Sequence, residues 1–273
     1  MDKNQKIMIG AIGTVVIAGG VIIGLILGRT PPKADLSTFH TEASTEAPTE
    51  TIPPETSVPE TEAQKAPEKP AAVISVEVMT YTAGKVSIEY PVIKQMEDEE
   101  KQNKANEHLK ANALSILNGY NISEESDTLT VSCEIISVDP KRLTAVYTGE
   151  LSIQGGAHPS RIFYTNTLNL NQMKDMGLND FTDAYTMAGY VLSDDVRFPK
   201  LNAQETSAVL EYRSTQPLEA LTAVFEKADF PVSKDKAWPE SFSYEKQGRI
   251  CFSLPVPHAL GDYVIVEFDP ATK

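Results

Sequence analysis

Apolar residues dominate the start of the chain in one unbroken stretch, residues 7–27, which carries no charge. A helix of this length rises about 30 Å, which matches the hydrocarbon core of a bilayer. The stretch is longer than the apolar part of a typical signal peptide, and no small-residue cleavage site follows it. The pattern therefore predicts one transmembrane anchor at residues 7–28, preceded by a short cytoplasmic tail at residues 1–6.

The next segment, residues 29–70, is dominated by Thr, Glu, Pro, Ala and Ser. It offers too little apolar surface to offset the entropy of ordering, so we expect a disordered, extended acidic stalk. Positive charges flank the apolar stretch on both sides and leave the orientation ambiguous. A long stalk is typical of an outward-facing domain that must clear a cell envelope, and a cytoplasmic tether is the alternative. We expect a single-pass protein of the cell membrane whose C-terminal domain is extracellular.

From residue 73 onward, alternation of apolar and polar positions predicts strands, and a spacing of three to four predicts helices. The predicted strands are 73–82, 85–90, 127–138, 142–153, 161–170, 241–245, 249–254 and 263–268, and the predicted helices are 95–118, 182–192, 203–212 and 218–228. No strand, helix and strand alternate as a βαβ unit in this interpretation. We therefore predict an α+β fold of antiparallel sheets with helices packed to one side. Its two subdomains are expected at residues 71–153 and 154–273.

Composition narrows the partners of this domain. The whole chain carries a net charge of −14, and residues 71–273 hold 29 acidic against 18 basic residues. Such an acidic domain is unsuited to nucleic acid or to anionic lipid, because both carry the same sign of charge. The charge keeps the domain soluble or attracts a cationic partner, and composition alone leaves both interpretations open.

The cysteines and histidines carry little metal or redox signal. Cys133 and Cys251 each lie in a strand-like stretch, and they form either one disulfide or two buried free thiols. The histidines show no metal-binding spacing, and the sequence contains no Cys-x-x-Cys motif. It also contains no Gly-x-Ser-x-Gly nucleophile elbow and no phosphate-binding loop. We expect no metal and no cofactor.

The most distinctive short sequence is Gly155-Gly156-Ala157-His158-Pro159, between two predicted strands. The glycines supply backbone angles that other residues reach poorly, and the proline fixes the exit of the loop. Three roles fit this loop: a structural turn, part of a binding surface, or a catalytic site with His158 as base. The sequence places no nucleophile and no orienting partner beside His158. We therefore expect these five residues to bind a ligand and expect no catalytic residue.

Exposed aromatic residues are further candidates for a binding surface, because Tyr and Trp anchor many interfaces. The candidates are Tyr185, Tyr190, Tyr212, Trp238 and Tyr263. For the single tryptophan, packing in or at the rim of the core is the alternative.

Three parts of the chain together resemble a known family. They are Ile88-Glu89-Tyr90-Pro91-Val92-Ile93 before a helix containing Asn103, Asn106 and Asn112, the loop at residues 155–159, and the hairpin at Gly248 followed by residues 255–261 and a last strand. Over about residues 75–268 the chain resembles the extracellular region shared by RsiV-type anti-sigma factors and PdaC-type peptidoglycan deacetylases.

The resemblance implies an exported domain that recognises a component of the envelope. In the RsiV branch the extracellular domain binds lysozyme, a strongly basic protein, and an acidic domain would attract it over a distance. Residues 1–6 are too short to hold a sigma factor, and the metal-binding residues of a deacetylase are missing. We therefore expect a membrane-anchored binding or sensing protein for lysozyme or another basic envelope protein. A peptidoglycan or wall-glycan binding module is the alternative, followed by a wall-modifying hydrolase or deacetylase.

Overall fold

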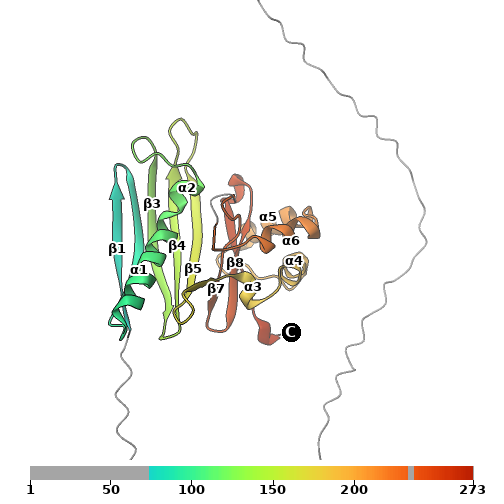
Figure 1. Ribbon diagram of the computed structural model, residues 1–273. Helices are drawn as coiled ribbons and strands as arrows, with labels where there is room; N and C mark the ends of the chain where they lie inside the picture. The colour runs from blue at the N-terminus through green and yellow to red at the C-terminus, as the bar shows by residue number, and fades with distance from the viewer. Residues whose placement is uncertain (1–73, 233–236, 273) are drawn as a thin grey trace, which may run out of the picture. The chain divides into compact units, whose positions relative to one another are not determined.

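The computed structural model describes residues 74–232 and 237–272 (Figure 1). The predicted tail, anchor and stalk, at residues 1–6, 7–28 and 29–70, lie outside the described residues. Within the described residues, no helix combines the length and the apolar character needed to cross a membrane. The fold of the described unit is α+β, with two sheets and two groups of helices.

The larger sheet contains six strands in the order of the sequence. Its strands are β1 (Ser75–Ala83), β2 (Val86–Lys94), β3 (Thr128–Val138), β4 (Arg142–Ser152), β5 (Ser160–Asn169) and β6 (Lys174–Met176). The boundary expected between residues 153 and 154 falls inside this sheet, because β4 and β5 pair from Arg142–Asn169 to Leu151–Ser160.

The sheet is mixed, so the prediction of purely antiparallel sheets is wrong at one position. Strands β2 and β3 pair in parallel where Val86–Ile88 meets Leu129–Val131, whereas the other neighbours are antiparallel. Helix α1 (Glu99–Leu114) and the short α2 (Ile116–Gly119) carry the chain back to the end of the sheet where β2 begins. A parallel pair requires such a crossover, so β2, α1 and β3 form a βαβ unit, contrary to the prediction that none is present.

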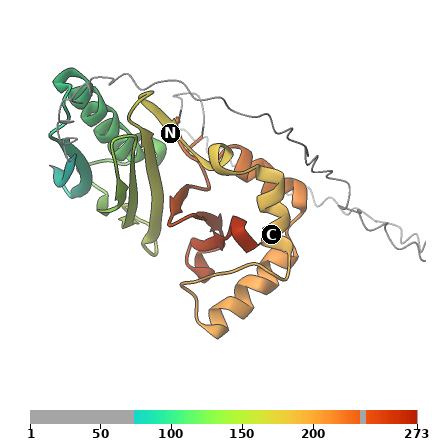
Figure 2. The ribbon, with the colours of Figure 1, turned by 90° about the horizontal axis from the view of Figure 1, so that it is seen from below.

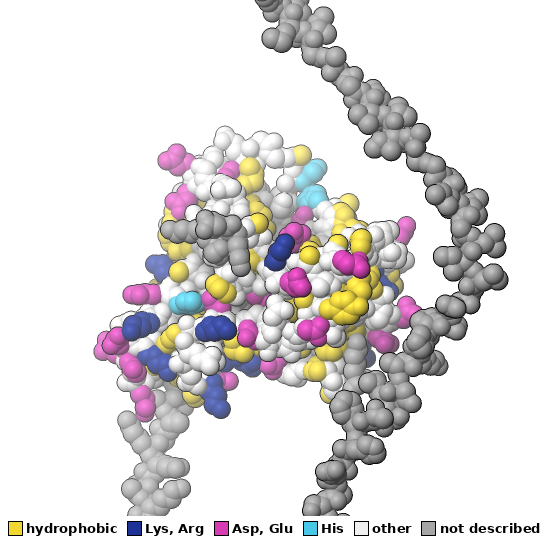
Figure 3. Space-filling view, turned by 45° about the vertical axis from the view of Figure 1, so that its right-hand side comes forward, with side chains coloured by type: hydrophobic (Ala, Val, Ile, Leu, Met, Phe, Trp, Pro, Cys, Tyr) yellow, Lys and Arg dark blue, Asp and Glu magenta, His cyan; other side chains and the backbone are white. Residues whose placement is uncertain are grey.

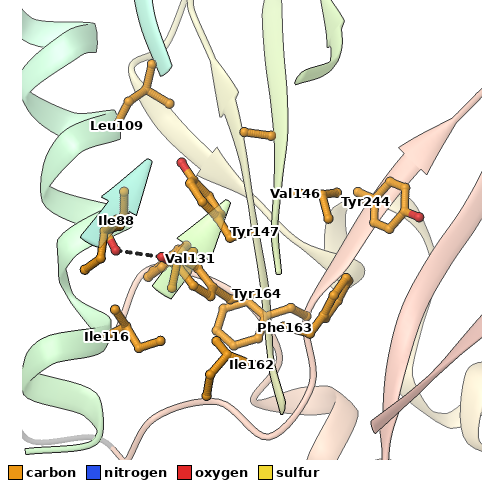
Figure 4. Packing of buried hydrophobic residues seen from close by; sticks show 14 of the residues in the cluster. Ile88, Leu109, Ile116, Val131, Val146, Tyr147, Ile162, Phe163, Tyr164 and Tyr244 are labelled. Carbon is orange, nitrogen blue, oxygen red and sulfur yellow. Dashed lines mark hydrogen bonds between the residues drawn. The ribbon is translucent and has the colours of Figure 1, made fainter. Parts of the chain in front are cut away.

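Helix α1 begins and packs for local reasons. The side chain of Asp98 accepts a hydrogen bond from the Lys101 N–H, which caps the first turn. Ala105, Leu109 and Ala113 recur at helical spacing and are fully buried against the six-stranded sheet. The helix therefore covers one face of this sheet, where its residues meet the buried side chains of β2 to β5 (Figure 4).

The smaller sheet is antiparallel and contains β7 (Ser243–Lys246), β8 (Arg249–Pro255) and β9 (Tyr263–Phe268). One of its faces packs against β4 and β5, through Tyr244, Cys251 and Ile265. Its other face forms a second core with a group of helices. These helices are α3 (Leu178–Phe181), α4 (Ala184–Leu192), α5 (Ala203–Ser214) and α6 (Leu218–Glu226), and two 3-10 turns, η1 (His258–Leu260) and η2 (Pro270–Thr272), complete the unit.

The described unit therefore has four layers: α1, the six-stranded sheet, the three-stranded sheet, and helices α4 to α6 (Figure 2). Each sheet has helices on one face only, and the two helical layers lie on opposite outer sides. Strand β4 lies between α1 on one face of the six-stranded sheet and the three-stranded sheet on the other. Residues 143–147 are all buried because both faces of the strand are covered.

A buried carboxylate joins α1 to the far edge of the larger sheet. Oδ1 of Asp175, on β6, accepts hydrogen bonds from Nε2 of His108 at 2.8 Å and from Nδ2 of Asn112 at 2.9 Å. It also accepts one from Nδ2 of Asn166, on β5, at 2.8 Å. Two of these donors come from the polar side of α1, so polar side chains of this helix help to hold it against the sheet.

A second buried carboxylate joins the two sheets to α3. Oδ2 of Asp229 accepts hydrogen bonds from the Leu178 N–H at 2.8 Å and the Ser243 hydroxyl at 2.6 Å. Its Oδ1 accepts from the Ser243 N–H and from the Thr165 hydroxyl. Gly177 leaves room for this carboxylate, since an added Cβ would lie 2.7 Å from Cβ of Asp229.

Candidate functional site

The loop at residues 153–159 joins β4 to β5 at the end of the sheet where β2 begins (Figure 1). Its base is fixed by the buried carboxylate of Asp127, which accepts hydrogen bonds from the Gln154 N–H at 2.8 Å and the Ser123 N–H at 2.9 Å. These bonds lower the pKa of Asp127, because they stabilise the ionised form. The loop therefore stands on a fixed base while residues 152–159 are exposed.

The glycines of the loop have different requirements. Gly155 has a φ of +82°, a left-handed conformation that glycine adopts without strain. Gly156 lies outside the left-handed region, and an added Cβ would lie 3.1 Å from the carbonyl oxygen of Ile153. The prediction that backbone angle determines the choice of glycine therefore applies to the first of the two.

His158 meets a residue from a distant loop. Its ring lies next to that of His258 in η1, with the centroids 6.0 Å apart and the planes 19° from parallel. Figure 3 shows two histidine side chains side by side on one face of the unit. The structure thus brings together two histidines that the sequence separates.

Asp262 links this histidine pair to β5. Its Oδ1 lies 2.8 Å from Nδ1 of His258, and its Oδ2 accepts a hydrogen bond from the Arg161 N–H at 2.7 Å. The two carboxylate oxygens therefore hold η1 and the start of β5 together and orient the imidazole of His258.

A groove of about 720 Å³ opens beside this cluster. Arg161 and Phe163 line it from β5, His258 and Tyr263 from η1 and β9, and Lys200 and Glu205 from the segment around the start of α5. Residues 155–159 do not line the groove, and the loop borders it through the contact of His158 with His258. The site therefore combines three segments that are remote in sequence.

The site contains part of the machinery of acid–base chemistry. An imidazole oriented by a carboxylate is one part of general acid–base catalysis, which also needs a nucleophile or a positioned water. Among the described residues, His258 is hydrogen-bonded to the carboxylate of Asp262, and neither His158 nor His258 has a hydroxyl or thiol as a hydrogen-bond partner. No cluster of three or more His, Cys, Asp or Glu side chains suited to a metal occurs within 74–232 and 237–272.

The two cysteines lie in different sheets, Cys133 on β3 and Cys251 on β8, and both are free thiols. Burial raises the pKa of Cys133 to about 12 and also raises the pKa of Cys251. A thiol with a raised pKa is a poor nucleophile near neutral pH, because the thiolate is the reactive form.

The aromatic candidates divide between packing and surface. Trp238 is half-buried in a cluster of rings, which agrees with a packing role, and Gly119 leaves room for its indole. Tyr190 is buried, Tyr185 is 64% exposed, and Tyr263 lines the groove. The rings around the indole are Tyr120, Tyr164, Phe230 and Phe242.

Sequence reasoning missed Arg161, Lys200 and Asp262. Asp262 follows His258 by four residues, and residues at this spacing can pair across a turn. The pairing of Asp262 with His258 could therefore have been predicted from the sequence. Arg161 carried no signal of its own, since its side chain is positioned by Gly261 and Tyr263, which are far away in sequence.

No protein-family model and no curated protein matches the chain. Among solved structures, the chain is similar to a DUF3298 family member from Bacteroides fragilis, with a TM-score of 0.40 and 14% identity over 74% of this chain and 91% of the other. It is also similar to a DUF3298 family protein from Pseudomonas aeruginosa, with a TM-score of 0.36 and 11% identity over 71% and 95% of the two chains. DUF3298 is the domain shared by RsiV-type and PdaC-type proteins. Similarity at this level assigns no ligand and no activity.

Proposed function

We propose that the described unit is the ligand-binding domain of a membrane-anchored, extracellular protein of the bacterial cell envelope. The observation that carries this proposal is the pairing of His158 with His258 beside an open groove of about 720 Å³, which His258 and Arg161 line. An exposed loop on a fixed base, beside a concave surface with a few polar groups, is the usual form of a recognition site. In this proposal the domain binds its ligand without transforming it.

The first ligand that we propose is lysozyme or another basic envelope protein. Residues 71–273 carry 29 acidic against 18 basic residues, which favours association with a cationic partner. Glu125 and Glu150 are exposed at the same end of the sheet as the loop. A basic protein that approaches this end would therefore meet both the loop and negative charge.

Calorimetric titration of residues 71–273 with lysozyme, at low and at moderate salt, tests this proposal. We expect a complex with a Kd of about 1 μM or lower, which weakens as salt screens the charges. Glu125→Lys should weaken it several-fold, while Glu107→Lys on α1, an equal change of net charge at another place, should have little effect. The absence of heat at either salt concentration would rule out lysozyme as the ligand.

Wall glycan is a second candidate, and the composition of the groove favours it. Tyr263 and Phe163 offer ring faces, and Arg161, Asn202 and Gln204 offer hydrogen-bond donors, which suits a sugar with polar substituents. Pull-down with purified cell wall distinguishes this candidate from a protein ligand. A hydrolase or deacetylase that uses His158 would instead show turnover that is lost in His158→Ala while the fold remains intact.

A further inference from the structure

We propose that the groove contains a carboxylate-binding subsite built around the guanidinium of Arg161, and that its ligand is an acidic sugar-peptide. This inference rests on the proposed role of the groove as the ligand site, and it specifies the chemistry of the wall-glycan candidate.

Neighbouring residues hold the Arg161 side chain in a defined place. Its guanidinium carbon lies 4.9 Å from the centroid of the Tyr263 ring, a cation–π contact that positions the planar group over the ring. A Cβ at Gly261 would lie 2.6 Å from Nη1 of Arg161, so the guanidinium occupies the space that the missing side chain leaves. The main chain of Arg161 is tied to Asp262 through its N–H. The donor group is therefore positioned before any ligand arrives.

The charge of Arg161 is not matched by a carboxylate of a described residue. Arg142, Arg213 and Arg249 each have a carboxylate oxygen within 4.0 Å, and Arg161 forms no such ion pair within the described part of the chain. Glu150 lies opposite Arg161 in the register of β4 and β5, yet its carboxylate stays beyond ion-pair distance. An exposed guanidinium that rests on a ring keeps its N–H donors free for a planar anion.

The surroundings favour a carboxylate that is attached to a larger, mostly uncharged group. Lys200 and His258 line the same groove as further basic groups, and Asn202 and Gln204 add amides. The carboxylate of Glu205 is already engaged with the Asn202 N–H at 2.9 Å.

Apolar walls occupy the rest of the groove and suit the body of a sugar or of a short peptide. These walls come from Leu201, Val209, Leu260 and Val264.

Two matched ligands separate the carboxylate from the sugar. N-acetylmuramyl-L-alanyl-D-isoglutamine carries a carboxylate and an N-acetyl sugar, whereas diacetylchitobiose carries N-acetyl sugars without a carboxylate. We expect residues 71–273 to bind the first at least about tenfold more tightly in calorimetry. Glycerol 3-phosphate serves as a third ligand, and equal binding of it would show a general anion site and overturn the carboxylate assignment.

Variants of the groove complete the test. Arg161→Gln should lower affinity for the muramyl dipeptide at least about tenfold and leave diacetylchitobiose unchanged, since only the first needs the guanidinium. Arg161→Lys should give an intermediate loss, because an ammonium group lacks the planar fork. Lys141→Gln, which removes an exposed positive charge at the other end of the sheet, should leave both affinities unchanged.

The two proposals fail separately. If the wild-type domain binds the two sugars equally, or if Arg161→Gln binds the dipeptide as tightly as the wild type while its circular dichroism is unchanged, the subsite is wrong. If neither sugar binds, this ligand class is wrong, and the titration with lysozyme still decides the proposed function.

Discussion

Asp229 is a buried acid that connects three parts of the fold. Burial raises its pKa to about 6, although the hydrogen bonds from Ser243, Leu178 and Thr165 act in the opposite direction. Burial therefore makes this carboxylate harder to ionise than an exposed one, while two main-chain N–H groups and two hydroxyls stabilise its charge. The sequence around Asp229 does not predict that it accepts these hydrogen bonds, because the donors lie far away along the chain.

Removal of this carboxylate should destabilise the domain strongly. Asp229→Ala leaves the N–H groups of Leu178 and Ser243 buried without an acceptor, and we expect a loss of about 3–5 kcal/mol in the free energy of unfolding. Urea denaturation at pH 7 measures this loss. The exposed Glu211, changed to alanine, is the control and should cost less than about 0.5 kcal/mol. A small effect of Asp229→Ala would contradict the structural role.

The sequence predicted the helices and strands themselves better than it predicted how the strands pair. Alternation predicted the long strands, and spacing predicted α1, α4, α5 and α6, with ends within a few residues in most cases. The short β6 and α3 were missed, since three or four residues are too few to show a period. The parallel pairing of β2 with β3 depends on how α1 packs across the sheet, which periodicity does not encode.

The hydrogen bond between His108 on α1 and Asp175 on β6 predicts that the stability of the domain depends on pH. The hydrogen bond to Asp175 raises the pKa of His108 above its ordinary value, because it favours the protonated ring. A raised histidine pKa contributes stability that is complete below the pKa of the unfolded chain, near 6.5, and is lost as pH rises through the pKa of the folded state.

Thermal unfolding of His108→Gln against the wild type measures this contribution. We expect the wild type to be more stable at pH 6 and the difference to shrink as pH rises to 9. Asn103→Gln, an exposed change on the same helix, should show no trend with pH. A difference that stays constant from pH 6 to 9 would show that the pair contributes no proton-linked stability.

In the described unit, residues 71–153 and 154–273 contribute side chains to the same hydrophobic core. Tyr147 on β4 stacks on Tyr164 on β5, with centroids 4.4 Å apart, across the expected boundary (Figure 4). Alternation predicted the α+β class, and the glycines and the proline predicted a loop at residues 155–159, because both predictions depend on local chemistry. The groove is lined by Arg161, Lys200 and His258, which are remote in sequence, and only the tertiary fold brings them to one place.

A fragment of residues 71–153 should therefore fail to fold alone. It would expose the buried face of β4 and lose the partner strand β5, along with the contacts to β7. We expect circular dichroism without a cooperative thermal transition, whereas residues 71–273 should unfold in one transition. A cooperative transition in the shorter fragment would instead support an independent first subdomain.

The direction in which the chain enters the domain has a mechanical consequence. Strand β1 begins at Ser75, at the opposite end of the sheet from the β4–β5 loop, and nine residues of it pair with β2. A load applied between this entry point and a ligand held at the loop runs along the strands. It would shear the whole β1–β2 ladder at once and would not open its hydrogen bonds one after another. Tension applied in this direction would therefore not unravel the domain from its N-terminal edge.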